Sequence, residues 1–373
     1  LSKNISLHDF WEIVSASSLF HDIWNPPFWH SGENSISDFF ISSKTWIEFI
    51  SKLQNKKEIN DFYLFEWNAQ WLRILCDREK ILPLTLAVIW TFCKYPREVC
   101  DNLDLEKEIK KRWISKKKNW VFQSEIKTFE KVVKDLWMIK DEDEKVISYF
   151  RHPLSYLVEA SDDICYMLMD LEDAVRLKIL KIEEVKEMLY PIIKYFYEDK
   201  KQEKFIQYFE EKFSVIPHKN EQMAYLRAKV VWILIELIWN AFIENYEEIM
   251  NWELKTDLFK CLPNWYGEAI KNIKSESFSK IYSYKPVMEI EAAWHEIIWW
   301  LLECFIWTIL YDTYKFRQYL ELLPDEIKNI IINSNETYYS KWRAILDYIS
   351  WMTDNYALSL YKKLKWIELP RIY

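Results

Sequence analysis

Apolar residues recur at intervals of three and four along most of this chain, which is the period of an α-helix with one buried face. Three runs show the pattern well, at residues 125–139, 182–198 and 221–250. These runs are also rich in Glu, Lys and Leu, which have high helix propensity. No long alternation of apolar and polar residues, typical of a half-buried β-strand, occurs in the sequence. The pattern therefore predicts an all-α protein.

The two most apolar stretches are each interrupted by a carboxylate. Residues 230–243 contain Glu236, and residues 296–311 contain Glu303. Neither stretch reaches the roughly 18 uncharged residues that a membrane-spanning helix needs. We therefore expect two buried helices of a globular protein and predict no membrane association.

The size and composition of the chain limit its organisation. With 373 residues, of which 50% are hydrophobic, the chain can bury one large core or two smaller ones. The polar segment at 198–205 comes closest to a domain boundary. We therefore predict a helical core in residues 1–200 and a C-terminal helical region in residues 201–373.

Net charge and cysteine usage disfavour several classes of protein. A net charge of -8 gives no general attraction to nucleic acid or to an acidic membrane surface. The six cysteines show no CxxC pair and no regular spacing, which disfavours a zinc ribbon or a disulfide framework and fits a reducing compartment. We expect buried thiols and a cytoplasmic location.

One run near the start of the chain, HDIWNPPFWHSGE at 21–33, combines metal-binding groups with a group that can transfer a proton. His21 and Asp22 offer an imidazole nitrogen beside a carboxylate oxygen, a mixed pair that suits Mn, Fe, Co, Ni or Zn, and Mg less well. His30 follows a Pro-Pro turn. The run predicts a metal-dependent phosphohydrolase, although two ligands are too few to hold the metal.

A second acidic run offers a further ligand. In RHPLSYLVEASDDICYMLMDLEDA, residues 151–174, Asp162, Tyr166 and Asp170 are spaced by four and so share one helix face. Carboxylates on a largely apolar helix need a partner, because burial of an unpaired carboxylate is costly. We predict that Asp162 is the third metal ligand. Solvated aspartates in the first turn of a helix are the alternative.

Five segments resemble, in this order, the successive motifs of the deoxyguanosine-triphosphate triphosphohydrolase family, a branch of the HD-domain phosphohydrolases. They are HDIWNPPFWHSGE (21–33), LFEWNAQWLRIL (64–75), FCKYPR (92–97), RHPLSYLVEASDDICYMLMDLEDA (151–174) and LDYISWMTDNYALSLYKKLK (346–365). The resemblance implies an all-α HD-domain catalytic core with a C-terminal helical extension. It also implies cleavage of a deoxynucleoside triphosphate to a deoxynucleoside and triphosphate, with Mn, Mg, Fe or Co as the divalent metal.

The resemblance implies roles for four residues near the metal. His30 is expected to transfer a proton, with Glu33 one helical turn later to orient the imidazole ring. Glu66 and Asn68 fall in the segment where the family has polar groups that line the site. These four residues are the expected catalytic and site-lining groups.

Other positions match the parts of the family site that hold the substrate. Lys94 and Tyr95 match a pair that touches the phosphates, a role that suits the point charge of a lysine. Tyr166 and Asp170 match positions beside the sugar, where an aromatic ring packed against C2′ would exclude a 2′-hydroxyl. Ordinary helix packing is the alternative for Tyr166. The basic segment at 107–120 is either a rim that attracts phosphate or a solvated basic loop.

Glycine and tryptophan usage departs from the average. The chain has 2 Gly and 21 Trp, whereas roughly 7% Gly, about 26 residues, is usual. Some of the tryptophans fall where the family pattern has glycine, namely Trp24, Trp29, Trp67, Trp71, Trp294, Trp300 and Trp351. Glycine there serves tight turns that an indole cannot imitate, which leads to the hypothesis that UGA codons read as glycine in the source stand here as Trp. A genuinely Trp-rich protein is the alternative.

The resemblance implies one more metal-binding histidine, in a helix upstream of His21, and the sequence has no counterpart for it. The sequence begins at Leu1, and the context of His8 does not match, so we expect His8 to be a surface or helix-start residue. We therefore expect that the N-terminal part of the catalytic core is missing. The chain would supply three of four metal ligands, and its activity by itself depends on the fourth.

Two other functions stay open beside the triphosphohydrolase. One is a different HD phosphohydrolase, such as a nucleotidase or a cyclic-nucleotide phosphodiesterase, and the other is a non-catalytic nucleotide-binding module. The expected partners are a deoxynucleoside triphosphate, further copies of the chain in a homo-oligomer and, by family analogy, single-stranded nucleic acid as an effector. The motifs do not indicate a base preference.

Overall fold

Every regular element that the structure describes is helical. The computed structural model describes residues 6–22, 26–77, 84–112, 114–141 and 146–367. Within these ranges, extended segments form isolated bridges but no strand. The prediction of an all-α protein is confirmed.

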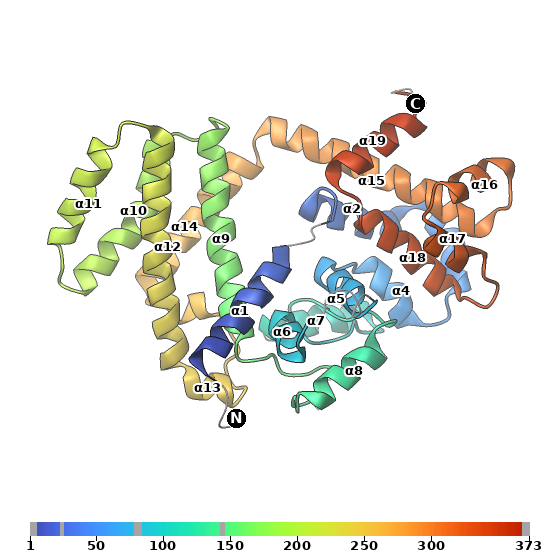
Figure 1. Ribbon diagram of the computed structural model, residues 1–373, viewed down its shortest axis with the longest axis horizontal. Helices are drawn as coiled ribbons and strands as arrows, with labels where there is room; N and C mark the ends of the chain where they lie inside the picture. The colour runs from blue at the N-terminus through green and yellow to red at the C-terminus, as the bar shows by residue number, and fades with distance from the viewer. Residues whose placement is uncertain (1–5, 23–25, 78–83, 113, 142–145, 368–373) are drawn as a thin grey trace. The chain divides into compact units, whose positions relative to one another are not determined.

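The chain divides into two compact units, and Figure 1 shows the helices of each. The unit that we call the α9 unit comprises Leu1–Val14 and His152–Glu289, and the α5 unit comprises Ser15–Arg151 and Ile290–Tyr373. The boundary expected near residue 200 lies inside the α9 unit, at the end of α10, and a domain division there stays a prediction.

The α9 unit is a bundle of amphipathic helices. It contains α9 (Ser155–Arg176), α10 (Ile182–Asp199), α11 (Lys204–Val215), α12 (Lys219–Glu244), α13 (Tyr246–Met250), the 3-10 helix η3 (Leu258–Cys261), α14 (Asn264–Ser277) and the π-helical turn η4 (Phe278–Tyr282). Helix α12 packs against α9 and α10, and α10 also packs against α14. Apolar side chains at helical spacing, including Ile192, Leu226 and Ile233, are fully buried between them.

The start of α9 is held by two hydrogen bonds. The Tyr156 hydroxyl donates to the Leu254 carbonyl at 2.6 Å in the interior of the unit. The backbone N–H of Leu154 donates to His152 Nδ1 at 3.2 Å. Burial lowers the pKa of His152 to about 4, so the imidazole is neutral near pH 7 and can accept that bond. These contacts fix the register of the helix that carries Asp162.

The α5 unit is built from shorter helices. They are α2 (Trp29–Ser42), α3 (Lys44–Phe49), η1 (Ile50–Lys52), α4 (Lys56–Tyr63), α5 (Trp67–Asp77), α6 (Leu86–Phe92), α7 (Leu103–Arg112), η2 (Ile114–Lys116), α8 (Ile126–Asp135), α16 (Tyr314–Glu321), α17 (Asp325–Ile332), α18 (Tyr338–Ser350) and α19 (Asp354–Leu364). Several begin at a polar residue whose side chain accepts a first-turn N–H, including Asn55, Thr85, Thr337 and Thr353. Such caps satisfy N–H groups that have no partner inside the helix.

Aromatic rings fill much of the core of the α5 unit. Phe40, Trp46, Phe62 and Trp342 come from α2, α3, α4 and α18, and all four are fully buried. The ring centroids of Trp46 and Trp342 are 4.5 Å apart, and those of Phe40 and Trp46 are 4.6 Å apart. Edge-on and tilted ring contacts at these distances stabilise a core beyond the burial of area alone.

The two most apolar stretches form long helices that each bury one face. Residues 230–243 lie in α12, which buries Val230 and Ile233 but exposes Ile235 and Ile243. Residues 296–311 lie almost entirely in α15 (Lys285–Leu310). By length and composition alone, α15 is the one helix of the described residues that could cross a membrane, yet it also supplies buried core residues to the α5 unit. The expectation of buried helices is therefore right for one face of each.

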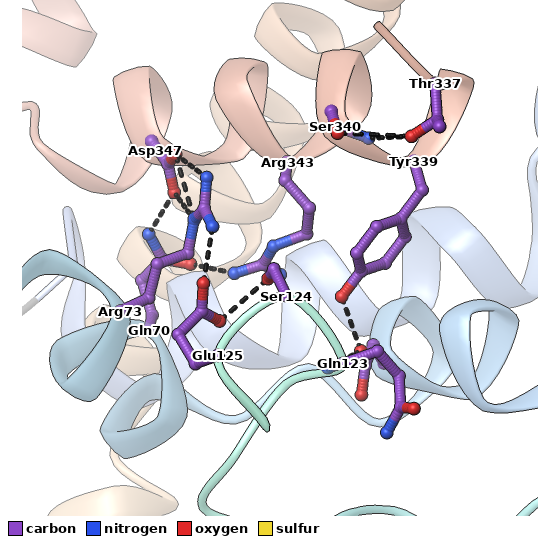
Figure 2. A network of polar contacts seen from close by, with 11 residues as sticks. Gln70, Arg73, Gln123, Ser124, Glu125, Thr337, Tyr339, Ser340, Arg343 and Asp347 are labelled. Carbon is purple, nitrogen blue, oxygen red and sulfur yellow. Dashed lines mark hydrogen bonds and ion pairs between the residues drawn. The ribbon is translucent and has the colours of Figure 1, made fainter. Parts of the chain in front are cut away.

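A buried polar network joins α5 to α18 (Figure 2). The Arg73 guanidinium pairs with Asp347, with 2.8 Å between Nη2 and Oδ2, and with Glu125, with 2.6 Å between Nη1 and Oε1. Gln70 donates from Nε2 to Asp347 Oδ1 at 2.6 Å and accepts from Arg343 Nη2 at 2.5 Å. Because Gln70 and Arg343 are fully buried, these bonds hold the two helices in one register.

The same network extends to α4 and to the segment before α8. The Tyr339 hydroxyl donates to Asp61 Oδ2 at 2.6 Å, and the backbone N–H of Gln123 donates to the same oxygen at 2.7 Å. Burial raises the pKa of Asp61 to about 8. The Arg343 guanidinium lies 3.7 Å from the centre of the Phe122 ring, a cation–π contact.

Replacement of Arg73 by Met should destabilise the α5 unit. The change leaves the buried Glu125 and the half-buried Asp347 without their cation, and we expect a loss of about 2 to 3 kcal/mol in the free energy of unfolding. Denaturant unfolding of the two proteins measures the difference. Arg317→Met is the matched control, because Arg317 pairs with Asp312 at the exposed surface, and it should leave the unfolding midpoint unchanged. Equal midpoints for the Arg73 variant and the unchanged protein would contradict the structural role of the network.

Candidate active site

A histidine and a carboxylate lie one turn apart at the start of α2. His30 Nδ1 is 3.3 Å from Glu33 Oε2, and the imidazole is exposed whereas Glu33 is buried, with 8% exposure. Gly32 packs closely against the preceding Pro-Pro turn. Only glycine fits there, because a Cβ at this position would lie 2.1 Å from the Pro27 carbonyl oxygen. The predicted pair of His30 and Glu33 is therefore in contact.

A second buried carboxylate faces the first. Glu66 immediately precedes α5 and is 4% exposed, and Asn68 Nδ2 donates to its Oε1 at 2.7 Å. Lys118 Nζ lies 2.7 Å from Glu66 Oε2 and 3.4 Å from Glu33 Oε1. One ammonium group thus bridges a carboxylate of α2 and a carboxylate just before α5. We call His30, Glu33, Glu66, Asn68 and Lys118 the Lys118 cluster.

The charges of the Lys118 cluster shift one another's pKa values. Burial and the nearby charge of Glu33 raise the pKa of Glu66. Burial also acts to raise the pKa of Glu33, but the hydrogen bond from His30 and the charge of Lys118 outweigh it and lower that pKa. The hydrogen bond to Glu33 raises the pKa of His30, so the protonated imidazole is favoured. Such an imidazolium, held by a carboxylate, can donate a proton to a departing oxygen.

Lys118 was not singled out from the basic segment at 107–120, and the structure separates it from its neighbours there. Lys107, Lys110 and Lys116 pair with Asp104, Glu106 and Asp141, respectively. Lys118 instead reaches the two carboxylates of the cluster. Three of these cations are therefore balanced by carboxylates outside the cluster, and Lys118 belongs to the candidate site.

A buried ion pair holds the backbone beneath Lys118. Arg97 is fully buried and donates to both carboxylate oxygens of Glu106, at 2.5 and 3.0 Å. Its Nε donates to the Lys116 carbonyl at 3.1 Å, and its own carbonyl accepts the N–H of Trp120 at 2.9 Å. Residues 116–120 are thus fixed on both sides of Lys118. No local spacing in the sequence signals this arrangement, because Arg97 and Lys118 are far apart along the chain.

The predicted phosphate-binding pair lies in the same unit as the Lys118 cluster. Lys94 and Tyr95 follow α6, and both are buried. The Lys94 carbonyl accepts from Arg151 Nε at 3.2 Å, and the Tyr95 ring is 5.4 Å from that of Trp120. The structure brings Tyr95 to the segment that carries Lys118, and contact of the pair with phosphate stays a prediction.

The structure describes the side chain of only one of the three predicted metal ligands, Asp162. His21 and Asp22 are the last residues of α1 (Leu7–Asp22), and their side chains lie outside the described residues. Asp162 lies on α9 in the other unit, partly buried. The side chains that the structure describes contain no group of three or more His, Cys, Asp or Glu that could hold a metal ion. The metal site therefore stays a prediction.

The predicted sugar-contacting residues share one face of α9, as their spacing indicates. Tyr166 and Asp170 follow Asp162 at intervals of four, and all three are partly buried. The Tyr282 hydroxyl donates to Asp170, and Lys274 Nζ lies 3.9 Å from the neighbouring Asp163. Packing inside the α9 unit thus accounts for part of this face, and contact with a sugar stays a prediction.

The fold and the sequence relatives define a class of protein. Residues 261–363, which include α15 to α18 and most of α19, match the Phosphohydrolase-associated domain. A deoxyguanosinetriphosphate triphosphohydrolase-like protein of Synechocystis sp. is 32% identical over 98% of the chain and 79% of its own length. A protein of the same description from Listeria monocytogenes is 30% identical over 95% of the chain and 77% of its own length. The chain is thus an all-α relative of phosphohydrolases.

The similarity extends to proteins whose names carry no qualification. A deoxyguanosinetriphosphate triphosphohydrolase of Salmonella paratyphi A is 26% identical over 96% of the chain and 79% of its own length. Together with the relatives above, this alignment along nearly the whole chain settles the family. The chain belongs to the deoxyguanosinetriphosphate triphosphohydrolase-like family, as the ordered motifs predicted.

Replacement of Lys118 by Met should make stability fall more steeply with pH. Without the ammonium group, the pKa of the buried Glu66 rises further, so the folded state keeps a proton that the unfolded state has already released. The free energy of unfolding should therefore drop more between pH 6 and pH 8 in the variant than in the unchanged protein, and urea unfolding at both pH values measures this. Lys117→Met, an exposed neighbour, is the control and should show the unchanged slope. A Lys118 variant with the slope of the control would contradict the bridging role.

Proposed function

We propose that this chain is the catalytic part of a metal-dependent hydrolase that cleaves deoxynucleoside triphosphates, dGTP or a broader set, to a deoxynucleoside and triphosphate. The observation that carries the proposal is the Lys118 cluster. It combines a histidine whose pKa is raised by a carboxylate with a cation placed between two buried glutamates. The names of the relatives indicate the substrate class.

In this proposal His30 is the proton donor. Cleavage at the α-phosphorus leaves a negative charge on the nucleoside oxygen, and the exposed imidazolium of His30 can protonate it. Glu33 orients the ring through its 3.3 Å contact and keeps it charged. Because the hydrogen bond from His30 and the charge of Lys118 lower the pKa of Glu33, this carboxylate stays ionised while His30 exchanges its proton with the substrate.

The remaining groups of the cluster would hold the polyphosphate and the attacking water. A triphosphate brings about four negative charges, so Lys118 is expected to turn from the glutamates toward the phosphates when substrate binds, with Lys94 and Tyr95 beside it. Asn68 would hold Glu66 in place, where its side chain can orient the attacking water through a hydrogen bond. Tyr166 and Asp170 are the proposed contacts to the deoxyribose.

His21, Asp22 and Asp162 are the proposed ligands of a divalent cation, Mn, Mg, Fe or Co, which would polarise a phosphate oxygen of the substrate. The residue types fit such an ion, because imidazole and carboxylate groups suit first-row divalent metals. A cytoplasmic homo-oligomer is part of the same proposal. The cysteines that the structure describes as free thiols are compatible with that location.

Product analysis tests the proposed reaction. With the protein made from its complete reading frame, dGTP and a divalent cation should give deoxyguanosine and tripolyphosphate in equal amounts, resolved by ion-exchange chromatography. A nucleotidase would instead release orthophosphate, and a phosphodiesterase would open a cyclic nucleotide. Either of these products in place of tripolyphosphate would replace the proposal by that of another HD phosphohydrolase.

Substitution of His30 tests the proposed proton donor. His30→Ala should lower kcat by about 10²- to 10⁴-fold with little change in KM, because a general acid acts mainly in the transition state. The control is His8→Ala, which removes an exposed histidine that pairs with Glu12, and it should leave both constants unchanged. Steady-state kinetics with dGTP measures both variants. Unchanged turnover in the His30 variant would exclude this residue as the acid.

A further inference from the structure

Three tryptophans end helices in a backbone conformation that favours glycine. Trp137 follows α8, Trp252 follows α13 and Trp366 follows α19, with φ angles of 56°, 58° and 61°. Each lies one residue beyond the last cap residue of its helix. Glycine is the usual residue at this position, because it enters the left-handed region without a steric penalty.

The hydrogen bonds at all three ends are those of a Schellman motif. Trp137 N–H donates to the Lys134 carbonyl at 3.2 Å, and Met138 N–H donates to the Val133 carbonyl at 3.0 Å. These are the paired bonds, three and five residues back, that close a helix around a left-handed residue.

The same pair of bonds recurs at the other two helix ends. Trp252 and Glu253 donate to the carbonyls of Ile249 and Glu248, and Trp366 and Ile367 donate to those of Lys363 and Lys362. The left-handed conformation is therefore built into each helix end.

At two of the three positions, 137 and 366, the tryptophan side chain makes little packing contact. Trp137 is 90% exposed and Trp366 is 80% exposed, so neither indole gains packing that would offset the strained backbone. Lys178 and Lys201 occupy the same kind of position after α9 and α10, which shows that a flexible side chain is tolerated there. A large exposed aromatic ring in this conformation calls for another explanation.

Tryptophan is over-represented among the left-handed residues. Of the seven non-glycine residues with positive φ that the structure describes, four are Trp, with Trp29 as the fourth. Because 21 of 373 residues are Trp, fewer than one of the seven would be expected by chance. The association points to positions that require glycine.

Buried tryptophans show a second and independent anomaly. The indole N–H groups of Trp46, Trp67, Trp90, Trp120 and Trp342 are buried and have no hydrogen-bond partner. A buried indole normally finds an acceptor, because an unpaired buried donor is costly. In the core these rings pack against other side chains but leave the indole N–H without an acceptor.

We infer that positions 29, 137, 252 and 366 are glycine in the protein that the source cell makes, because a glycine-charged transfer RNA reads the UGA codon there. Positions 137, 252 and 366 are assigned by backbone conformation, without reference to any family pattern. With glycine at positions 137, 252 and 366, helices α8, α13 and α19 each end in an ordinary glycine cap. The inference is independent of the proposed activity.

The conformational part is tested on the chain as its sequence is printed. Trp137→Gly and Trp366→Gly should each shift the unfolding equilibrium toward the folded state, by about 5- to 30-fold, because the left-handed penalty of an L-residue is removed. Trp239→Gly is the control: Trp239 is an exposed residue inside α12, with 47% exposure, and glycine in a helix interior should shift the equilibrium the other way. Thermal and urea unfolding measure all three. Destabilisation by Trp137→Gly and Trp366→Gly would overturn the inference.

The decoding part is tested on the native protein and its gene. Tandem mass spectrometry of peptides that span positions 137, 252 and 366, isolated from the source cell, should read glycine at each, and the codons there should be UGA. Tryptophan in these native peptides would overturn the inference, even if glycine stabilises the chain. Glycine in the peptides together with UGG codons would also overturn it, because the codon reading would then be wrong.

Discussion

The contact between α5 and α18 is the constraint on which the rest of the α5 unit depends. Arg73 forms ion pairs with both Asp347 and Glu125. The buried amide of Gln70 donates a hydrogen bond to Asp347 and accepts one from Arg343. A polar contact of this kind admits one register only, because a shift of either helix would leave buried charges unpaired. Glu66 and Asn68 lie at the start of α5, so the contacts between α5 and α18 also set the position of the Glu66 carboxylate, which faces Glu33. Helix α18, which lies in the region that matches the Phosphohydrolase-associated domain, thus helps to position the candidate site.

Charge compensation in the Lys118 cluster follows from that placement. Two buried glutamates, Glu33 in α2 and Glu66 just before α5, would repel each other at close range, and one ammonium group between them makes the arrangement stable. In the proposed reaction, the phosphates of the substrate would compete with the two glutamates for Lys118.

The sequence was a good guide to whatever depends on local spacing. Helical periodicity predicted an all-α protein. The family resemblance, together with the interval of one helical turn, predicted the contact between His30 and Glu33. Lys118 could not be chosen among its basic neighbours, since its position depends on the distant Arg97–Glu106 pair. The sequence also led us to expect that the apolar part of α12 is buried, whereas one face of it is exposed. Hydrophobicity shows that a helix is apolar but not which of its faces packs against other helices. The metal ligands His21, Asp22 and Asp162 remain predictions from motif and chemistry.

The link between the first and last motifs has a consequence for biosynthesis. The backbone N–H of Phe28 donates to Asp354 Oδ1 at 2.9 Å, across 326 positions of sequence. The turn that precedes His30 is therefore completed by a residue that is translated much later than the turn itself. A nascent chain therefore cannot complete this turn until α19 has been synthesised, and the geometry of the His30–Glu33 pair is set only at that late stage.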